Sequence, residues 1–348
     1  MRIQRYNVIA FFNLKSVSYL SCNTFNLHEM EDVNKQKWNW TGFFYLFIGI
    51  FTWATVELTV KLIQANVSAI TINFYRVFFG GLVLIIYTIA TKQTRSFIYF
   101  AKTYPKAYIP ATFFGLAFGL VLFFYGVTLT QANLSATIFS ANPIVISAFM
   151  MSFRGEKRTW NKILGIILGF IGVIIIVTEF NLSALISPEN ILGNLLVLIG
   201  MFMWCIHVII GKILLSQAPK TDQNGNPIPP ITSMIYNSVT FLWGIIMMIP
   251  FLFFTDDWQY LFSHSAITWV GLFYLGAITG GFGYVAFFKG LQMMDASKGI
   301  TMFYFKPVIA TILAFFLLNE IPKASLYIGI IIEIFALFFV AWEPKAKS

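Results

Sequence analysis

Charged residues are scarce in this sequence. Asp, Glu, Lys and Arg make up 11% of its 348 residues, hydrophobic residues make up 58%, and the mean hydropathy is +0.77. Soluble domains carry about 25% charged residues. A chain with so little charge cannot cover its surface with polar groups in water, so most of that surface is expected to face lipid.

Cysteine and histidine are scarce as well. The two cysteines, Cys22 and Cys205, show no CxxC spacing, and the three histidines, His28, His207 and His264, are scattered along the chain. These residues predict neither a disulfide framework nor a metal site. Because a membrane enzyme would need clustered His, Asp or Cys near one membrane face, we expect no enzyme, no catalytic residue, no metal and no cofactor.

The net charge of +9 is explained by orientation in a bilayer. In a soluble protein it would suggest a nucleic-acid partner. Here the basic residues lie in short loops between apolar runs, where they set the topology of a membrane protein. Nucleic acid is therefore not expected as a partner.

Ten apolar runs are each close to the ~20 residues that a helix needs to cross a bilayer. They cover residues 41–63, 69–90, 107–128, 134–153, 160–178, 191–211, 232–254, 267–288, 296–318 and 324–342. Sixteen Lys or Arg residues fall on one side of the resulting topology, and only Lys61 and Lys323 fall on the other. The sequence thus predicts an all-α integral membrane protein with about ten transmembrane helices and both termini cytosolic.

The first forty residues differ from the rest. They are polar in patches, and their longest apolar run, residues 8–12, is too short for the core of a signal peptide. Residues 1–40 are predicted to form a poorly ordered cytosolic extension. Met30 opens a more ordinary stretch, so translation from Met30 rather than Met1 is a hypothesis.

The chain repeats itself. Equivalent residues recur 164 positions later, or 151 positions later near the start of each half. The pairs include Pro143 with Pro307, Glu156 with Glu320, Gly126 with Gly290, Phe139 with Phe303, Trp53 with Trp204 and Lys61 with Lys212. Because each half holds five helices, an odd number, the second half enters the membrane from the opposite face. Two inverted five-helix repeats with a substrate site between them are typical of secondary transporters.

A stretch that begins at Ala132, ANLSATIFSANPIVISAFMMSFRGEKRTWNKILGIILGFIGVIIIV, carries a resemblance to a known family. Its Ala/Ser-rich helix start, mid-helix proline and Gly-Glu turn resemble the signature of EamA-type permeases of the drug/metabolite transporter superfamily. A second copy follows from Asp295, with Asn319-Glu320 in place of Gly-Glu. The resemblance covers about residues 41–343.

The resemblance implies repeats at 41–179 and 190–343 and a multi-pass protein of the plasma membrane. It implies a permease for small metabolites such as amino acids that works by alternating access, with proton coupling left open. An organic-anion or sugar-phosphate exchanger is the alternative, and a membrane sensor or scaffold on the same fold is a third reading. The expected partners are membrane lipid and a small-molecule substrate; a proton and a second copy of the chain are left open.

Four charged residues lie inside apolar runs: Glu57, Arg76, Lys306 and Glu333. Each costs about 2.5–3.5 kcal/mol at the centre of a membrane helix, so it should meet a partner or a cavity. In one reading Glu57 pairs with Arg76 and Lys306 with Glu333. In the other, Glu57 contacts a substrate amine or takes part in proton coupling, and Lys306 binds an anionic group, as the resemblance to sugar-phosphate carriers implies.

Two prolines, Pro143 and Pro307, interrupt helices at matching positions. Each frees a backbone carbonyl. The prolines are therefore predicted either as packing kinks or as hinges that line the solute route beside Asn142 and Tyr304.

Aromatic and polar residues complete the candidate set. Trp53 and Trp204 are predicted to line the cavity because they are placed symmetrically. His207 is either a core histidine or a group that titrates near physiological pH, and Tyr236 is a weaker candidate. Two glutamates that end helices are predicted to be structural, fixing the tight turn into the next helix: Glu156 and Glu320.

Overall fold

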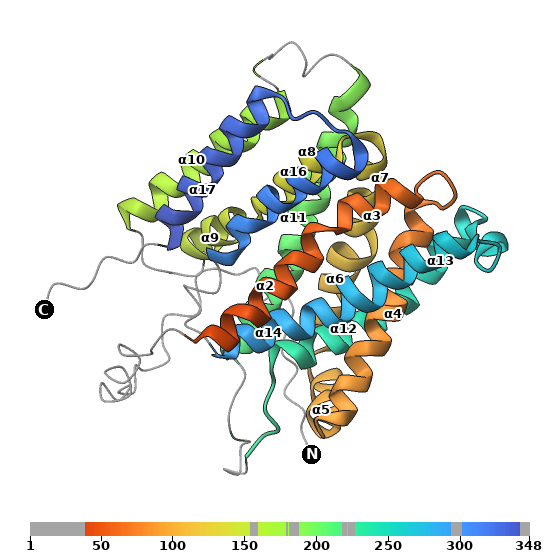
Figure 1. The fold of residues 1–348 in the computed structure, drawn as a ribbon. Helices are drawn as coiled ribbons and strands as arrows, with labels where there is room; N and C mark the ends of the chain where they lie inside the picture. Colours follow the sequence, from red (N-terminus) through yellow and green to blue (C-terminus); the bar gives the residue numbers. More distant parts are fainter. Residues whose placement is uncertain are drawn as a thin grey trace, which may run out of the picture. The chain divides into compact units, whose positions relative to one another are not determined.

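The computed structural model describes residues 39–153, 159–178, 180, 188–217, 221, 227–293 and 301–341. The predicted extension up to residue 38 and Glu156 lie outside these residues. Within them the chain is almost entirely helical (Figure 1).

The first half is a series of helices with short connections. They are α2 (Trp40–Ala54), α3 (Val56–Ile63), α4 (Ala69–Ala90), α5 (Thr94–Thr103), α6 (Pro105–Thr112), the π-helical segment η3 (Phe113–Phe118), α7 (Gly119–Leu129), α8 (Ala132–Ser140), α9 (Asn142–Phe153) and α10 (Trp160–Thr178).

The second half follows the same order. It consists of α11 (Pro188–Gln217), α12 (Ser233–Phe254), the 3-10 turn η5 (Asp257–Tyr260), α13 (Ala266–Phe273), the π-helical segment η6 (Tyr274–Phe282), α14 (Gly283–Met293), the 3-10 turn η7 (Thr301–Tyr304), α16 (Phe305–Leu318) and α17 (Ala324–Ala341).

These helices fall on the predicted apolar ranges. Seven helical segments of the described residues are long and apolar enough to cross a membrane: Trp40–Ile63, Ala69–Ala90, Pro105–Leu129, Ala132–Ser152, Ile191–Leu215, Ser233–Phe254 and Ala266–Met293. Three more apolar helices are shorter: Ile163–Ile176, Phe305–Leu318 and Ala324–Ala336. The chain is therefore a helical multi-pass membrane protein.

One helix was not predicted. α5 lies where the sequence indicates a basic loop, and it packs against α12. Its buried residues are Ser96 and Phe100, whereas Arg95 and Lys102 are exposed. With only ten residues and one buried face, it is an amphipathic helix that is too short to cross a membrane.

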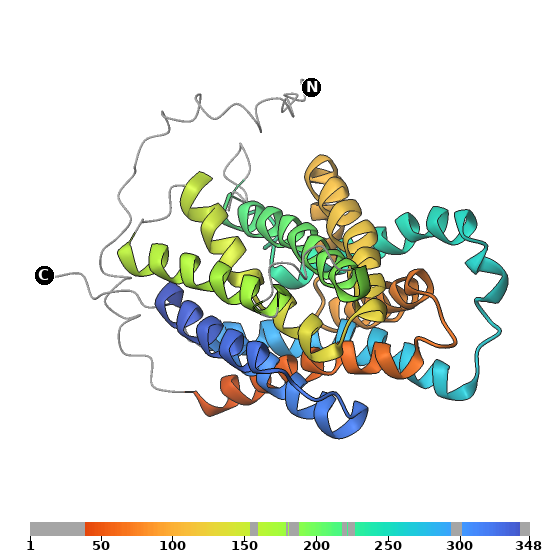
Figure 2. The ribbon, with the colours of Figure 1, turned by 90° about the horizontal axis from the view of Figure 1, so that it is seen from above.

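The two halves pack on each other through equivalent helices. α7 packs on α11 and α14 packs on α2, while α10 packs on α17, α8 on α16 and α4 on α12. The neighbouring helices α10 and α17 are seen side by side in Figures 1 and 2. The pairs α10–α17 and α4–α12 each join equivalent helices, and α7–α11 has its counterpart in α14–α2, as a two-fold relation between two copies requires.

Glycines at the contact between the halves show the same two-fold relation, because equivalent glycines make equivalent close contacts. A Cβ on Gly200 would lie 2.7 Å from the carbonyl oxygen of Gly119, and a Cβ on Gly49 would lie 3.0 Å from that of Gly283. Positions 49 and 200 are related by the offset of 151, and positions 119 and 283 by the offset of 164. Small residues at these places let the helix backbones approach closely, which is how membrane helices pack.

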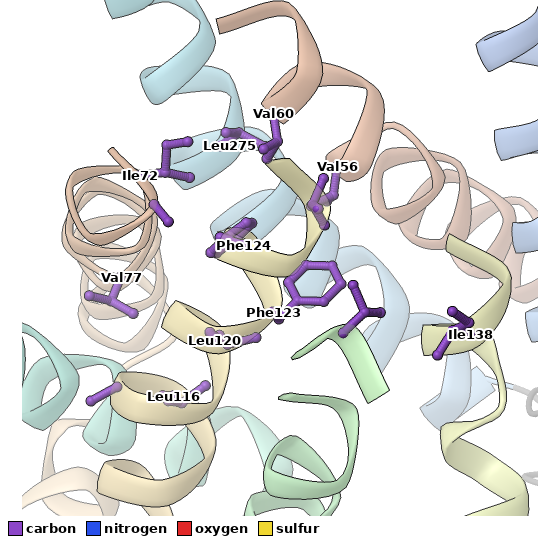
Figure 3. Packing of buried hydrophobic residues seen from close by; sticks show 14 of the residues in the cluster. Val56, Val60, Ile72, Val77, Leu116, Leu120, Phe123, Phe124, Ile138 and Leu275 are labelled. Carbon is purple, nitrogen blue, oxygen red and sulfur yellow. The ribbon is translucent and has the colours of Figure 1, made fainter. Parts of the chain in front are cut away.

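Helix α7 lies in the middle of the main apolar cluster. Leu120, Phe123 and Phe124 of α7 lie between Val77 of α4 and Val56 of α3 (Figure 3). The cluster thus places the start of α3 beside the centre of α7. This position matters because α3 carries a buried carboxylate.

Two membrane helices of the described residues are interrupted along their length, and a third changes its helix type near its start. The first breaks at Thr55, between α2 and α3, and the Thr55 hydroxyl donates to the carbonyl of Thr52 at 2.7 Å. Another breaks at Ala141, between α8 and α9, and the described segment that begins at Thr301 passes from the 3-10 turn η7 to α16 next to Lys306. Interrupted helices are tolerated in a membrane where the freed backbone groups meet protein or a cavity.

Candidate functional site

A pocket lies where the interrupted helices meet. Its lining comes from both halves and consists of Trp53, Val56, Glu57, Arg76, Leu120, Phe123, Phe139, Asn142, Trp204, Tyr284, Phe303 and Lys306. Six of the nine predicted cavity residues are in this set: Trp53, Glu57, Arg76, Asn142, Trp204 and Lys306. The structure therefore brings together residues that lie up to 253 positions apart in the sequence.

A buried ion pair crosses the pocket from one half to the other. Lys306 Nζ lies 2.9 Å from Glu57 Oε1, and the two side chains are 5% and 1% exposed. The same ammonium lies 4.8 Å from the centre of the Phe139 ring. A carboxylate and an aromatic face both stabilise a buried cation, so Lys306 is held at the pocket wall.

This pairing corrects both predicted ion pairs. Glu57 pairs with Lys306 rather than with Arg76, and both carboxylate oxygens of the fully buried Glu333 have no hydrogen-bond partner within the described part of the chain. Depth along a helix can be read from the sequence and places Glu57 and Arg76 at one pocket. The direction of a side chain around its helix cannot be read in this way.

Arg76 stands apart from the ion pair. It is 7% exposed and lines the pocket, and its Nε and Nη1 have no hydrogen-bond partner among the described residues. Its Cζ lies 5.8 Å from the centre of the Phe124 ring. The pocket wall thus holds two cations and one carboxylate, which leaves one positive charge without a counterion from the wall.

Most other residues of the pocket wall follow the internal sequence repeat. Pairs related by the offsets of 151 and 164 lie together around the pocket: Trp53 with Trp204, Phe139 with Phe303, Leu120 with Tyr284 and Asn142 with Lys306. The charged residues do not follow the repeat, because the equivalents of Glu57, Arg76 and Lys306 are the uncharged Val208, Thr240 and Asn142. The repeat supplies an aromatic frame, and the charges come from positions that differ between the halves, with Glu57 and Arg76 in the first half and Lys306 in the second.

Trp53 is fixed by contacts on two sides. Its Nε1 donates to the carbonyl of Thr279 at 3.1 Å, a backbone oxygen of the π-helical segment η6. Its ring lies 5.1 Å from that of Tyr284 and 5.8 Å from that of Phe303. In the other half Trp204 lies 5.4 Å from Phe139. A set of aromatic faces this rigid can stack on a flat or cationic ligand.

Pro143 has a defined structural consequence. It cannot donate to the carbonyl of Phe139, four residues earlier, and the side-chain amide of Asn142 donates to that oxygen at 2.7 Å instead. The carbonyl that Pro143 frees is therefore bonded within the break. This favours the predicted packing kink over a carbonyl that lines the solute route. The side chain of Tyr304 lies outside the described part of the structure.

His207 and Tyr236 do not line the pocket. The Tyr236 hydroxyl donates to the His207 carbonyl oxygen at 2.8 Å and lies 3.1 Å from His207 Nδ1. A Cβ added to Gly115 would overlap the His207 side chain, and one added to Gly211 would lie 2.6 Å from the Tyr236 ring, so both side chains pack closely against backbone. The geometry favours the prediction of a core histidine over that of a solute contact.

Glu320 makes a contact that sequence reasoning missed. Its two carboxylate oxygens accept the backbone N–H groups of Ala132 and Asn133, at 2.8 and 3.1 Å. It therefore caps the first turn of α8 in the other half instead of fixing its own turn. The sequence held a signal for this, because α8 begins at Ala132 with Gln131 before it, and that residue makes no capping bond.

Comparison with known proteins identifies the family. The model of the EamA-like transporter family matches residues 40–178 and again residues 191–342. The chain belongs to the EamA-like transporter family.

Individual relatives agree with this assignment. The chain is 23% identical over 310 residues to an S-adenosylmethionine uptake transporter of Rickettsia prowazekii, covering 87% of this chain and 93% of that one. It is 24% identical over 209 residues to an uncharacterized transporter of Clostridium kluyveri, covering 60% of this chain and 62% of the relative's length. A solved crystal structure of a protein matches with a TM-score of 0.56 at 15% identity, covering 86% of this chain and 97% of that one, which shows a shared fold.

Several aromatic residues of the pocket could not be identified from the sequence. Phe123, Phe139, Tyr284 and Phe303 line the pocket but were not candidates, because phenylalanine is abundant in lipid-facing and core positions alike. Phe139 and Phe303 did stand out as a repeat pair. Because these two residues occupy equivalent positions in the two EamA-like copies, the repeat could have indicated that they lie at the interface between the copies.

Proposed function

We propose that this protein is a secondary transporter that moves small metabolites such as amino acids across the plasma membrane by alternating access. The observation that carries the proposal is the pocket itself, which both repeats line and which the Lys306–Glu57 pair spans. A buried charge pair in a membrane is costly and normally marks a solute or ion pathway.

The membrane arrangement that goes with this proposal has ten crossings, inverted repeats and both termini in the cytosol. Cysteines placed one at a time at positions 155 and 320 test it. Labelling by a membrane-impermeant maleimide should occur from opposite sides of the membrane. Labelling of both positions from one side contradicts the inverted arrangement.

The relatives named as S-adenosylmethionine uptake transporters support one kind of substrate. That compound combines an amino-acid headgroup, a sulfonium cation and a flat ring system. The pocket offers a carboxylate and two cations for the headgroup and aromatic faces for the cation and the ring. Amino acids and their larger derivatives are therefore the substrates that we propose.

An organic-anion or sugar-phosphate exchanger is the second candidate. The excess positive charge at Arg76 favours it, whereas the pairing of Lys306 with Glu57 removes the residue on which it first rested. The test for both is a thermal-shift screen of the purified protein against amino acids, S-adenosylmethionine, organic acids and sugar phosphates, followed by uptake of radiolabelled hits into proteoliposomes. If no compound is taken up above the level of empty liposomes, the proposed function is wrong.

We propose Glu57 as the group that couples uptake to protons, since its Oε2 has no hydrogen-bond partner within the described residues and its Oε1 already meets Lys306. In that case, uptake by Glu57→Gln should lose the dependence on a pH gradient that the wild type shows. Wild-type dependence in this variant assigns the coupling to another group.

A further inference from the structure

The pocket holds a buried guanidinium that the fold does not require. Arg76 is on α4, and its equivalent on α12 is Thr240, at the same place in a helix of the same length, since α4 and α12 start and end 164 residues apart. Thr240 is fully buried, and within the described part of the chain its hydroxyl bonds only to the carbonyls of Tyr236 and Asn237 in its own helix. The second repeat therefore folds with a small neutral residue at this position.

Arg76 also lacks what a structural arginine needs. A buried guanidinium is normally matched by a carboxylate or by several carbonyls, since leaving a buried donor unpaired is costly. Here Nε and Nη1 have no partner among the described residues, and Lys306 already occupies Oε1 of Glu57, the one carboxylate of the pocket wall. The guanidinium therefore has an open donor on each of its two forks, Nε/Nη2 and Nη1/Nη2, and either fork fits an acceptor with two oxygens.

We propose that Arg76 binds the carboxylate of the transported compound. Guanidinium and carboxylate match in a two-pronged hydrogen-bond geometry, and a bound carboxylate would cancel the excess positive charge of the wall. This assignment rests on the proposed function. It narrows the substrate class to compounds with a free carboxylate next to a flat or cationic part that meets the aromatic faces of Trp53 and Trp204.

The test uses probes that differ only in the carboxylate. S-adenosylmethionine is compared with its decarboxylated form, and phenylalanine with phenylalaninamide, by binding to purified protein and by competition against uptake of the radiolabelled hit of the metabolite screen. The wild type should prefer the carboxylate form by about tenfold or more, because a charge-assisted buried hydrogen bond is at stake. Arg76→Gln should bring that ratio close to one, and Thr240→Ala should leave it unchanged.

The outcomes separate the two claims. A folded Arg76→Gln protein that keeps the wild-type preference overturns the assignment and leaves the proposed function standing. The assignment is also overturned, and the proposed function kept, if the protein transports a compound without a carboxylate and binds none of the four probes. Arg76→Lys keeps the charge, so a partly restored preference in this variant supports the assignment if Arg76→Gln is unstable. No transport of any compound overturns the proposed function itself.

A second inference rests on Glu320. The carboxylate joins the end of α16 to the first turn of α8, which belong to different repeats. Both helices run to the pocket, since α8 carries Phe139 and α16 carries Lys306. Around this junction a polar mouth is lined by residues that include Lys61, Thr130, Gln131 and Glu320.

The mouth and the pocket share helices. Glu57 of the pocket and Lys61 of the mouth are four residues apart on α3, which is one helical turn. Lys61 donates to the Thr128 carbonyl at 3.2 Å and lies close enough to Glu320 for an electrostatic interaction. We infer that the Glu320 cap is a latch that keeps the passage from this mouth to the pocket closed and that must open to admit solute from this side.

The test measures access to the pocket. Val56→Cys in a Cys22→Ser/Cys205→Ser background reports reagent reaching the pocket, and Leu129→Cys identifies the side of the membrane on which the mouth lies. Glu320→Gln should raise labelling of Cys at position 56 from that side about two- to thirtyfold, the range that loss of a helix cap gives. Lys289→Met, which removes a lysine outside the mouth and the pocket and leaves both capping bonds in place, is the control.

The latch is overturned if Glu320→Gln and Glu320→Ala both fold and label at the wild-type rate. An increase of the same size from both sides, or in Lys289→Met as well, also overturns it. Uptake need not be measured for this test, so its result is independent of the substrate.

Discussion

Removing either member of the Lys306–Glu57 pair should destabilise the protein far more than removing both. Each side chain is almost fully buried, and Glu57 Oε2 has no other partner among the described residues. Lys306→Met would leave the carboxylate uncompensated, at a cost of about 3–5 kcal/mol, and Glu57→Gln would leave the ammonium in the same situation. The double variant Glu57→Gln/Lys306→Met removes both charges and should cost less than either single change.

The assay is a double-mutant cycle on the free energy of unfolding in detergent. The predicted coupling between the two positions is about 3 kcal/mol or more, because the penalty for an unpaired buried charge appears in both single variants and not in the double. Lys289→Met is the matched control, since the Lys289 ammonium lies 4.8 Å from the Tyr45 ring, without a salt bridge to any described carboxylate, and should cost about 1 kcal/mol or less. If the double variant loses the sum of the single losses, the ion pair as described is wrong.

Three further predictions concern packing and backbone contacts. Gly49→Ala and Gly200→Ala should each lower the free energy of unfolding by about 1–3 kcal/mol, because an added Cβ would lie within 3.0 Å of a partner backbone; Gly81→Ala, whose nearest neighbour would be 3.4 Å away, should change it little, and equal effects at all three would refute the close approach. Asn73→Ala should cost about 1–3 kcal/mol in the same assay, because the side-chain amide serves two carbonyls of η3 at 2.9 and 3.1 Å. Trp53→Phe keeps an aromatic ring but loses the bond to η6, so unfolding should become easier by about 1 kcal/mol and the uptake rate of the screen's hit should fall; an unchanged rate would show that the position of the ring does not matter.

Much of the fold could be predicted from the sequence, because a membrane imposes strong rules on the chain. Apolar length marks the helices, and the offsets of 151 and 164 place equivalent residues at equivalent contacts, as Gly49 and Gly200 show. Helix α5 escaped prediction because it is short and only one of its faces is buried, so its apolar content resembles that of a loop.

The sequence predicted which charged residues belong to the site, but not which of them bond to each other. The cost of burying charge singled out Glu57, Arg76 and Lys306, and all three line one pocket. Their pairing could not be predicted, since it depends on the break at Thr55 and on the junction before α16, which rotate side chains in a way that residue spacing does not encode. The Glu320 cap was missed for a related reason, because its partners lie 187 and 188 residues away.

The most direct test of the account compares uptake by the wild type with uptake by Glu57→Gln/Lys306→Met, the variant expected to stay folded without the charges. Both proteins are reconstituted into liposomes at equal density and given the radiolabelled hit of the metabolite screen. The account predicts saturable uptake by the wild type and uptake no greater than that of empty liposomes by the double variant. Equal rates in the two proteins would contradict it, because solute would then cross without using the pocket.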